Sequence, residues 1–208
     1  MPARRPARSK GAADRATRDR ILASALDVFG ARGFDGARTR DIATVAGANL
    51  GLIQYYFGGK EKLWRAAVDH AFEQLWTALD GVSVRNFADP AGLAEVVRVA
   101  VRFVAAHPAL VRLMNDEGKR DSPRLRWLVD RHGRRLYDTA GAVLAGVRRD
   151  GVLAGVEPIH LYYLFVGAAG LMFSQSAECR RLTGVDPTKS PAMIEAHAET
   201  LVRLLVTR

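Results

Sequence analysis

Residues 58–62, GGKEK, place a lysine at the start of a helix. Gly58 and Gly59 interrupt the chain, and Lys60 opens a segment whose apolar spacing predicts a helix to about Asp80. A helix N-terminus favours anions, so helix stability alone does not explain a lysine there. A nucleic-acid phosphate would resolve this conflict, because free backbone N–H groups, the helix dipole and the ammonium would all face it.

Catalytic patterns do not compete with this interpretation. The chain has no GxSxG, HExxH, Walker or Rossmann glycine pattern. The single cysteine, Cys179, excludes an intramolecular disulfide and is typical of a reducing cytoplasm. We therefore predict that the chain is not an enzyme and has no cofactor. We also predict no metal site, because these histidines lack metal-ligand spacing and cysteine partners: His70, His107, His132, His160 and His197.

Two short helices joined by a glycine turn precede Lys60. Thr39 is a suitable N-cap for the first, and Gly47 stands where its left-handed C-cap is wanted. Asn49 is the expected N-cap of the second helix, residues 50–57. This arrangement is the helix-turn-helix signature, although an ordinary αα-corner would have the same local pattern.

A longer helix, expected from about Asp14 to Arg32, supports the two short ones. Its apolar residues face one side, and Gly33 follows as a C′ glycine. We predict a three-helix head with a small core made of Phe29, Phe34, Ile42, Val45, Ile53 and Phe57.

Positive charge is concentrated in this part of the chain. The net charge is +9, and residues 1–62 contain 12 Lys/Arg against 6 Asp/Glu. Residues 1–13 include two prolines and four cationic residues, which predicts a disordered basic arm. Such an arm either follows the DNA duplex or is a solubilising tail that adds only salt-dependent affinity.

The length of 208 residues allows one large domain or two small ones, and 49% hydrophobic residues can build a real core. The chain has no apolar run of 18 residues, so no membrane span is predicted. No apolar segment follows the basic N-terminus, so no secretory signal is predicted. A cytoplasmic protein without membrane contact is expected. Breakers divide the rest of the chain into helices of about 89–107, 109–118, 121–150, 157–182 and 191 to the end.

Residues 15–65 resemble the TetR family of transcriptional regulators. The resemblance rests on the order of a basic arm, a helix, GF, TxxIAxxAG, a short helix ending in YYF, and GKExL. It implies an all-α fold with a three-helix head and a larger helical ligand-binding and dimerisation domain, with about nine helices. The predicted divisions are an arm at 1–13, a DNA-binding domain at 14–60 and an effector-binding and dimerisation domain at 61–208.

The second short helix departs from the family pattern at two positions. Leu50 replaces a commonly polar residue, and Gln54 replaces a frequent tyrosine. Gln can pair with adenine and Leu can meet a thymine methyl, so both are candidates for base readout. Tyr56 either holds a phosphate or packs partly in the core. The predicted DNA-binding residues are Arg38, Thr39, Arg40, Asn49, Leu50, Gly51, Gln54, Tyr55, Tyr56 and Lys60.

The resemblance also implies an effector pocket and a dimer interface in the larger domain. Large apolar residues of this kind are more often ordinary core than pocket wall, and surface exposure explains Glu117 equally well. An apolar lining would favour a hydrophobic effector. The candidates are Trp76, Phe103, Leu113, Met114, Glu117, Trp127, Phe165, Met172 and Phe173. The last two helices form either internal core or half of a four-helix dimer interface. The predicted interface residues are Leu161, Leu164, Ala168, Leu171, Gln175, Ile194, Ala198, Leu201 and Leu205.

Together these features predict a homodimeric, sequence-specific repressor that binds a palindromic operator and is released by a small hydrophobic effector. Two-fold symmetry would place the two recognition helices roughly 34–36 Å apart, about one turn of DNA. The alternatives are a constitutive DNA-binding protein or an activator without a ligand, and more remotely a helical enzyme.

Overall fold

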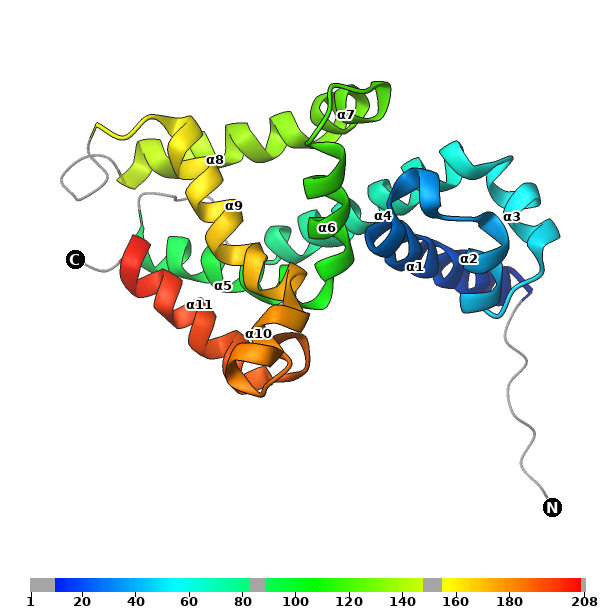
Figure 1. The fold of residues 1–208 in the computed structure, drawn as a ribbon. Helices are drawn as coiled ribbons and strands as arrows, with labels where there is room; N and C mark the ends of the chain where they lie inside the picture. The colour runs from blue at the N-terminus through cyan, green and yellow to red at the C-terminus, as the bar shows by residue number, and fades with distance from the viewer. Residues whose placement is uncertain (1–9, 83–88, 148–154, 207–208) are drawn as a thin grey trace, which may run out of the picture. The chain divides into compact units, whose positions relative to one another are not determined.

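The computed structural model describes residues 10–82, 89–147 and 155–206, and each regular element in these ranges is a helix (Figure 1). The predicted all-α class is therefore confirmed. The helices are α1 (Lys10–Gly36), α2 (Thr39–Val45), α3 (Leu50–Phe57), α4 (Lys60–Asp80), α5 (Pro90–Ala106), α6 (Pro108–Glu117), α7 (Pro123–Leu128), the π-helical turn η1 (Val129–Gly133), α8 (Arg134–Val147), α9 (Pro158–Ser174), α10 (Ser176–Thr183), the 3₁₀ turn η2 (Pro187–Lys189) and α11 (Pro191–Leu205).

The chain forms two compact units, Met1–Ala71 and Phe72–Arg208, which we call the head and the body. The boundary lies inside α4, further along the chain than the division after residue 60 that the sequence suggested. The reason is that the first half of α4 contributes to the head. Leu63 and Trp64 are fully buried, and the Trp64 ring meets Phe34 edge to face at 6.4 Å.

Helix α1 begins at Lys10, so the prediction of a disordered arm is wrong for residues 10–13. Residues 1–9 of that arm lie outside the described residues. Gly33 has a left-handed backbone with φ 67°, and it breaks the regular geometry of α1 after Arg32, where the sequence predicted a C′ glycine.

The head core contains most of the residues predicted for it. Phe29, Ile42, Ile53 and Phe57 are buried, and Phe34 is half-buried against Phe29 at a ring distance of 5.9 Å. Val45 was predicted wrongly, because its side chain is 61% exposed. Helix α2 has only seven residues, and its inward face is taken by Ile42 and Ala43 together with the following Ala46.

Helix α9 is the central helix of the body, with α5, α6, α8 and α11 packed around it (Figure 1). Helix α5 packs in addition along α11. The cluster at this junction is apolar throughout. Its buried members are Ala94, Val97, Val101, Ala105, Ala169, Phe173, Ala198, Leu201 and Val202, with Phe165, Met172, Ile194 and Leu205 packed against them.

Two long predicted helices are interrupted in the structure. The helix expected over residues 157–182 ends at Ser174, because Gln175 leaves the helical region and α10 then begins. The buried Ser174 donates its hydroxyl to the Leu171 carbonyl oxygen, and Arg112 of α6 donates to the Ser174 carbonyl oxygen at 3.3 Å. Partners outside the helix backbone therefore hold the chain at this break.

The second interruption is the π-helical turn η1, which separates α7 from α8. It buries His132, whose ring stacks on Phe72 at 4.1 Å and meets Trp127 edge to face at 5.6 Å. An extra residue in a helical turn shifts the faces of the two flanking segments relative to each other. The apolar faces of α7 and α8 can therefore point in different directions, although the two helices follow each other without a loop.

Bidentate ion pairs fasten α5 to α11 along the surface of the body. Arg98 donates to Glu199 at 2.6 and 3.2 Å, and Arg102 donates to Glu195 at 2.8 and 2.7 Å. These hydrogen bonds lower the pKa of Glu199 and the pKa of Glu195 below their ordinary values.

We expect the α5–α11 ion pairs to make stability depend on pH in the acid range. Because the folded pKa values are lowered, the pairs stabilise the fold above the ordinary glutamate pKa of about 4.3. That stabilisation is lost as the pH falls through the lowered folded values. Urea midpoints measured from neutral to acid pH should fall less steeply in a Glu195→Gln, Glu199→Gln double variant. Identical pH dependence in the two proteins would contradict this role.

Candidate nucleic-acid interface

Helices α2 and α3 and the turn between them have the geometry of a helix-turn-helix. Gly47 in the turn has φ 57°, and Asn49 caps α3 by accepting from the Gly51 backbone N–H at 2.7 Å. Gly58 closes α3 in the left-handed conformation, at the glycine break that the sequence predicted. Thr39 was predicted wrongly as the cap of α2, since Arg38 occupies the cap position and makes no side-chain cap bond.

Side chains of α1 hold this unit in place. The Arg20 guanidinium donates from Nε to the Ala46 carbonyl oxygen at 2.8 Å, at the C-terminal end of α2. A cation there is favoured by the helix dipole and takes up a carbonyl that has no partner within the helix. Further along α1, Arg32 forms an ion pair with Asp41 of α2. The turn of the motif is thus supported from outside as well as by its own glycine.

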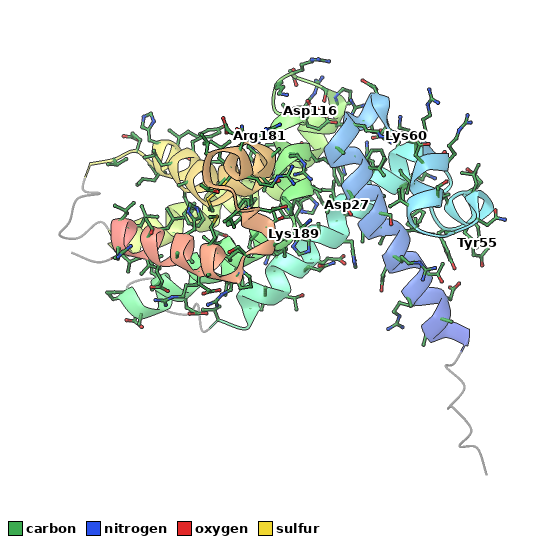
Figure 2. The ribbon with its side chains drawn as sticks, turned by 60° about the horizontal axis from the view of Figure 1, so that its bottom comes forward. Asp27, Tyr55, Lys60, Asp116, Arg181 and Lys189 are labelled. Carbon is green, nitrogen blue, oxygen red and sulfur yellow. The ribbon has the colours of Figure 1, made fainter. Side chains whose placement is uncertain are left out.

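Helix α3 turns one face into the head and the other to solvent. Ile53 and Phe57 are buried, whereas Leu50 and Gln54, spaced i and i+4, form an exposed row. Tyr55 is 79% exposed and extends away from the helices of the head (Figure 2). Of the predicted DNA-binding residues, Thr39, Tyr56 and Lys60 are half-buried, and the exposed ones are Arg38, Arg40, Asn49, Leu50, Gly51, Gln54 and Tyr55.

Lys60 is the first residue of α4, as its position after the glycine pair predicted (Figure 2). Its ammonium lies 4.6 Å from the centroid of the Phe34 ring and donates to the Asp35 carbonyl oxygen at 3.4 Å. The Phe34 ring and the Asp35 carbonyl therefore partly offset the unfavourable position of the Lys60 ammonium at the helix N-terminus, a role that we had assigned to a phosphate alone. An ammonium has three donors, so a phosphate contact remains a prediction.

Tyr56 donates its hydroxyl to the carboxylate of Asp14 on α1. This hydrogen bond is the main reason that the pKa of Tyr56 is raised above its ordinary value, with desolvation as the next cause. The ring meets Tyr55 edge to face at 5.2 Å and Phe57 at 6.0 Å. The hydroxyl that we predicted to hold a phosphate is thus bound within the head.

The predicted pocket residues divide between the body core and its margins. Phe103, Leu113, Glu117 and Phe173 are buried, and the others, Trp76, Met114, Trp127, Phe165 and Met172, are half-buried. Glu117 is satisfied within the chain, because Arg124 donates to its carboxylate at 2.8 Å. Ordinary core packing, which the sequence left open, is the observed state of Phe173, Phe165 and Met172.

Two open grooves lie on the described surface of the body. One of about 510 Å³ is lined by Asp130, Arg134, Arg135, Asp138, Thr139 and Ala142. The other, of about 230 Å³, is lined by Arg102, Ala105, Ala106, Thr188, Pro191, Ile194 and Glu195. None of the nine predicted pocket residues lines either groove, so an effector site remains a prediction.

The predicted dimer residues divide into an exposed set and a set packed in the core. On α9, Leu164 is 62% and Leu171 49% exposed, and Ala168 between them is exposed as well, as is Gln175 just beyond the helix. The four residues predicted on α11, together with Leu161 of α9, belong to the core of one chain instead. Leu161, Ala198 and Leu201 are buried, and Ile194 and Leu205 pack against the core cluster, so these five assignments are corrected. An apolar stripe buried by α5 has the same sequence pattern as one buried by a partner.

Neither a membrane helix nor a metal cluster is found in the part of the chain that the structure describes. No helix there is long and apolar enough to cross a bilayer. Within the same ranges, no three His, Cys, Asp or Glu side chains are grouped so that they could hold a metal ion.

Sequence reasoning missed three residues of the head that matter for this surface. Asp14 and Arg20 contact α3 and the end of α2 from α1, and Val45 is exposed beside the turn. The sequence identified Asp14 only as the approximate start of the first helix. No local pattern reveals that its partner lies 42 positions further along the chain.

A capped helix-turn-helix with an exposed second helix, followed by a larger helical unit, defines a helix-turn-helix DNA-binding regulator. Residues 21–67 match the model of the bacterial regulatory proteins of the tetR family. Residues 90–205 match the model of the tetracyclin repressor-like C-terminal domain. The chain belongs to the tetR family of bacterial transcriptional regulators, and the prediction that it is not an enzyme is confirmed.

Individual relatives agree with this assignment. The chain is 31% identical over 144 residues to the HTH-type transcriptional regulator RutR of Escherichia coli (strain K12), covering 69% of this chain and 68% of RutR. It is 38% identical over 106 residues to the HTH-type transcriptional repressor NicS of Pseudomonas putida, covering 50% and 49%.

Solved structures share the fold at low sequence identity. AibR, in complex with isovaleryl coenzyme A and operator DNA, has a TM-score of 0.68 at 15% identity, covering 92% of this chain and 98% of AibR. The fatty acid degradation regulator FadR from Bacillus halodurans has a TM-score of 0.62 at 18% identity, covering 92% and 97%.

Proposed function

We propose that this regulator is a cytoplasmic repressor that binds a palindromic operator as a homodimer and is released by a small hydrophobic effector. The observation that carries the DNA-binding part is the exposed face of α3. Leu50, Gln54 and Tyr55 are exposed there, while the opposite face is buried in the head. An exposed, capped helix of this kind is what a major groove accommodates. NicS, a relative, is named a repressor, which supports the sign of regulation proposed here.

Selection of bound sequences from random double-stranded DNA is the most direct test. Two symmetric heads should enrich a palindrome whose half-sites are separated by about one turn of DNA. Enrichment of a single, non-repeated site would contradict dimeric readout. Absence of any enrichment would contradict sequence-specific binding altogether.

Gln54 and Lys60 should have different effects on that selected operator. Gln54→Ala should cost about 1–3 kcal/mol at one base pair and relax the preference there, because a bidentate contact to adenine is lost. Lys60→Ala should weaken all sequences alike and reduce the salt slope by about one, because a phosphate contact is lost. Titrations at several salt concentrations distinguish the two. Unchanged base preferences in Gln54→Ala would show that its assignment to base readout is wrong.

The surface that we propose for dimerisation is the exposed stripe of α9 with the adjoining edge of α11. Leu164, Ala168 and Leu171 follow one another at i, i+4 and i+7 on a single face of α9. His197 of α11 donates from Nε2 to the Ala168 carbonyl oxygen at 2.8 Å, which places that edge of α11 beside the stripe. Leu204, two turns further along α11, is also exposed. A second copy of this surface would cover these apolar side chains.

Release by an effector would act as a population shift. A ligand bound in the body would favour a separation of the two heads that no longer matches neighbouring major grooves. The structure of AibR with both a coenzyme A thioester and operator DNA supports ligand control on this fold. The buried state of Phe103, Leu113 and Phe173 instead favours the alternative, a constitutive regulator with a solid body. Operator titrations with a panel of hydrophobic small molecules separate the two, because a constitutive regulator would keep the same affinity with each of them.

A further inference from the structure

Two side chains at the start of α1 contact neighbouring residues at the end of α3. Asp14 accepts the hydrogen bond of the Tyr56 hydroxyl, and the Arg18 guanidinium lies 5.5 Å from the centroid of the Phe57 ring. Asp14 and Arg18 are spaced i and i+4, so they lie on the same face of α1. This face therefore contacts the C-terminal turn of α3 through a carboxylate and a guanidinium.

The bond to Asp14 determines what the Tyr56 hydroxyl can do. A phenol has a single proton to donate, and here the proton is donated to a carboxylate of the same chain. Phosphate oxygens in DNA only accept hydrogen bonds, so Tyr56 cannot donate to a phosphate while this bond exists. The negative charge of Asp14 would also repel a phosphate placed at the same hydroxyl.

Helix α3 is short and has a small buried face. It has eight residues, and only Ile53 and Phe57 are buried. Asn49 caps its first turn, but its last turn is followed by the glycine pair, Gly58 with φ 67° and Gly59 with φ 145°. The Gly58 N–H closes the last turn on the Gln54 carbonyl oxygen at 2.9 Å, and the contacts of Tyr56 and Phe57 with α1 connect this end to the rest of the head.

We propose that Asp14 is a positioning residue for DNA recognition, which acts by holding Tyr56 and with it the C-terminal turn of α3 against α1. Tyr56 then has a structural role and is not a phosphate ligand. The neighbouring Gln54 and Tyr55 are the side chains that it orients toward DNA. This inference rests on the proposed operator binding. It replaces the phosphate contact that the sequence suggested for Tyr56.

The test uses the full-length protein, its selected operator and a scrambled duplex of equal length. Asp14→Ala and Tyr56→Phe should each weaken operator binding about fivefold, which corresponds to the roughly 1 kcal/mol net worth of one hydrogen bond. The double variant should lose no more than either single variant, because both remove the same bond. Asp14→Asn is the matched control. It loses the charge but keeps an oxygen that accepts from Tyr56, so its operator affinity should stay within about twofold of the wild type.

Binding to the scrambled duplex distinguishes positioning from general loss of folded protein. Asp14→Ala and Asp14→Asn should bind that duplex as tightly as the wild type or more tightly, since each removes one negative charge. A merely structural effect would instead weaken both duplexes alike and lower the thermal midpoint measured by circular dichroism.

Several results would overturn the proposal. If Asp14→Ala binds the operator more tightly than the wild type, the carboxylate competes with a phosphate for Tyr56. If Tyr56→Phe costs a further fivefold in the Asp14→Ala background, the hydroxyl contacts DNA directly. Wild-type affinity in both single variants would show that the bond has no role in recognition. Failure of the wild type to bind its selected operator would contradict the proposed function itself, and so is distinguishable from these outcomes.

Discussion

Leu171→Glu is expected to convert the protein from a dimer to a monomer and to weaken operator binding by about 10²- to 10⁴-fold. Leu171 is 49% exposed and is the last residue of the α9 stripe, one turn beyond Ala168. Two copies of a glutamate near a symmetry axis would bury unpaired negative charge. Without the dimer, the second head no longer binds at the high effective concentration set by the first, and that avidity is lost.

Leu182→Glu is the control for this experiment. Leu182 is 80% exposed on α10, outside the proposed dimer surface, so the same change should leave mass and operator affinity unchanged. Analytical ultracentrifugation at micromolar concentration gives the mass, and operator titration gives the affinity. A dimeric Leu171→Glu protein would place the interface elsewhere. A monomeric wild type would contradict dimerisation altogether.

Phe173→Ala is expected to lower the free energy of unfolding by about 3–5 kcal/mol, the usual cost of removing a buried aromatic ring. Phe173 is fully buried at the junction of α5, α9 and α11, and its ring meets His197 edge to face at 5.6 Å. Urea unfolding followed by circular dichroism measures the loss. If Phe173 instead lined a preformed effector pocket, its removal would enlarge that pocket at little cost in stability.

Leu182→Ala serves as the matched control for that measurement. The side chain is also apolar but exposed, so the substitution should change the free energy of unfolding by less than about 0.5 kcal/mol. A Phe173→Ala protein as stable as Leu182→Ala would contradict the assignment of Phe173 to the body core.

Local sequence signals were sufficient for much of the fold. Asn49 caps α3 and Gly58 ends it because both effects depend on residues within one turn. Pro90, Pro108, Pro123, Pro158 and Pro191 each begin a helix, as the fixed φ of proline predicts. The buried positions of α3, Ile53 and Phe57, followed from helical spacing, and the exposed Leu50 and Gln54 followed with them.

Local signals failed where the partner of a residue lies far away in the sequence. Arg112 of α6 donates to the Ser174 carbonyl oxygen beside the break at Gln175, and residues of α5 pack with Ala198 and Leu201 in the body core. In each case the residue pattern is compatible with two structures. The pattern around Gln175 fits a continuous helix or a broken one, and the apolar stripe of α11 fits an intermolecular face or an internal one. The choice between them depends on which other surface covers the residues, and that is a tertiary property.

The sequence by itself therefore determined that this protein has a helix-turn-helix, where its second helix begins and ends, and which side chains that helix exposes. Caps, glycine turns and helical periodicity act over a few residues, so they can be read along the chain. Only the tertiary structure decided that Tyr56 is held by Asp14 and that the stripe of α11 lies inside the body. Both depend on contacts between distant segments, whose pairing is set by the packing of the whole unit and has no local signal.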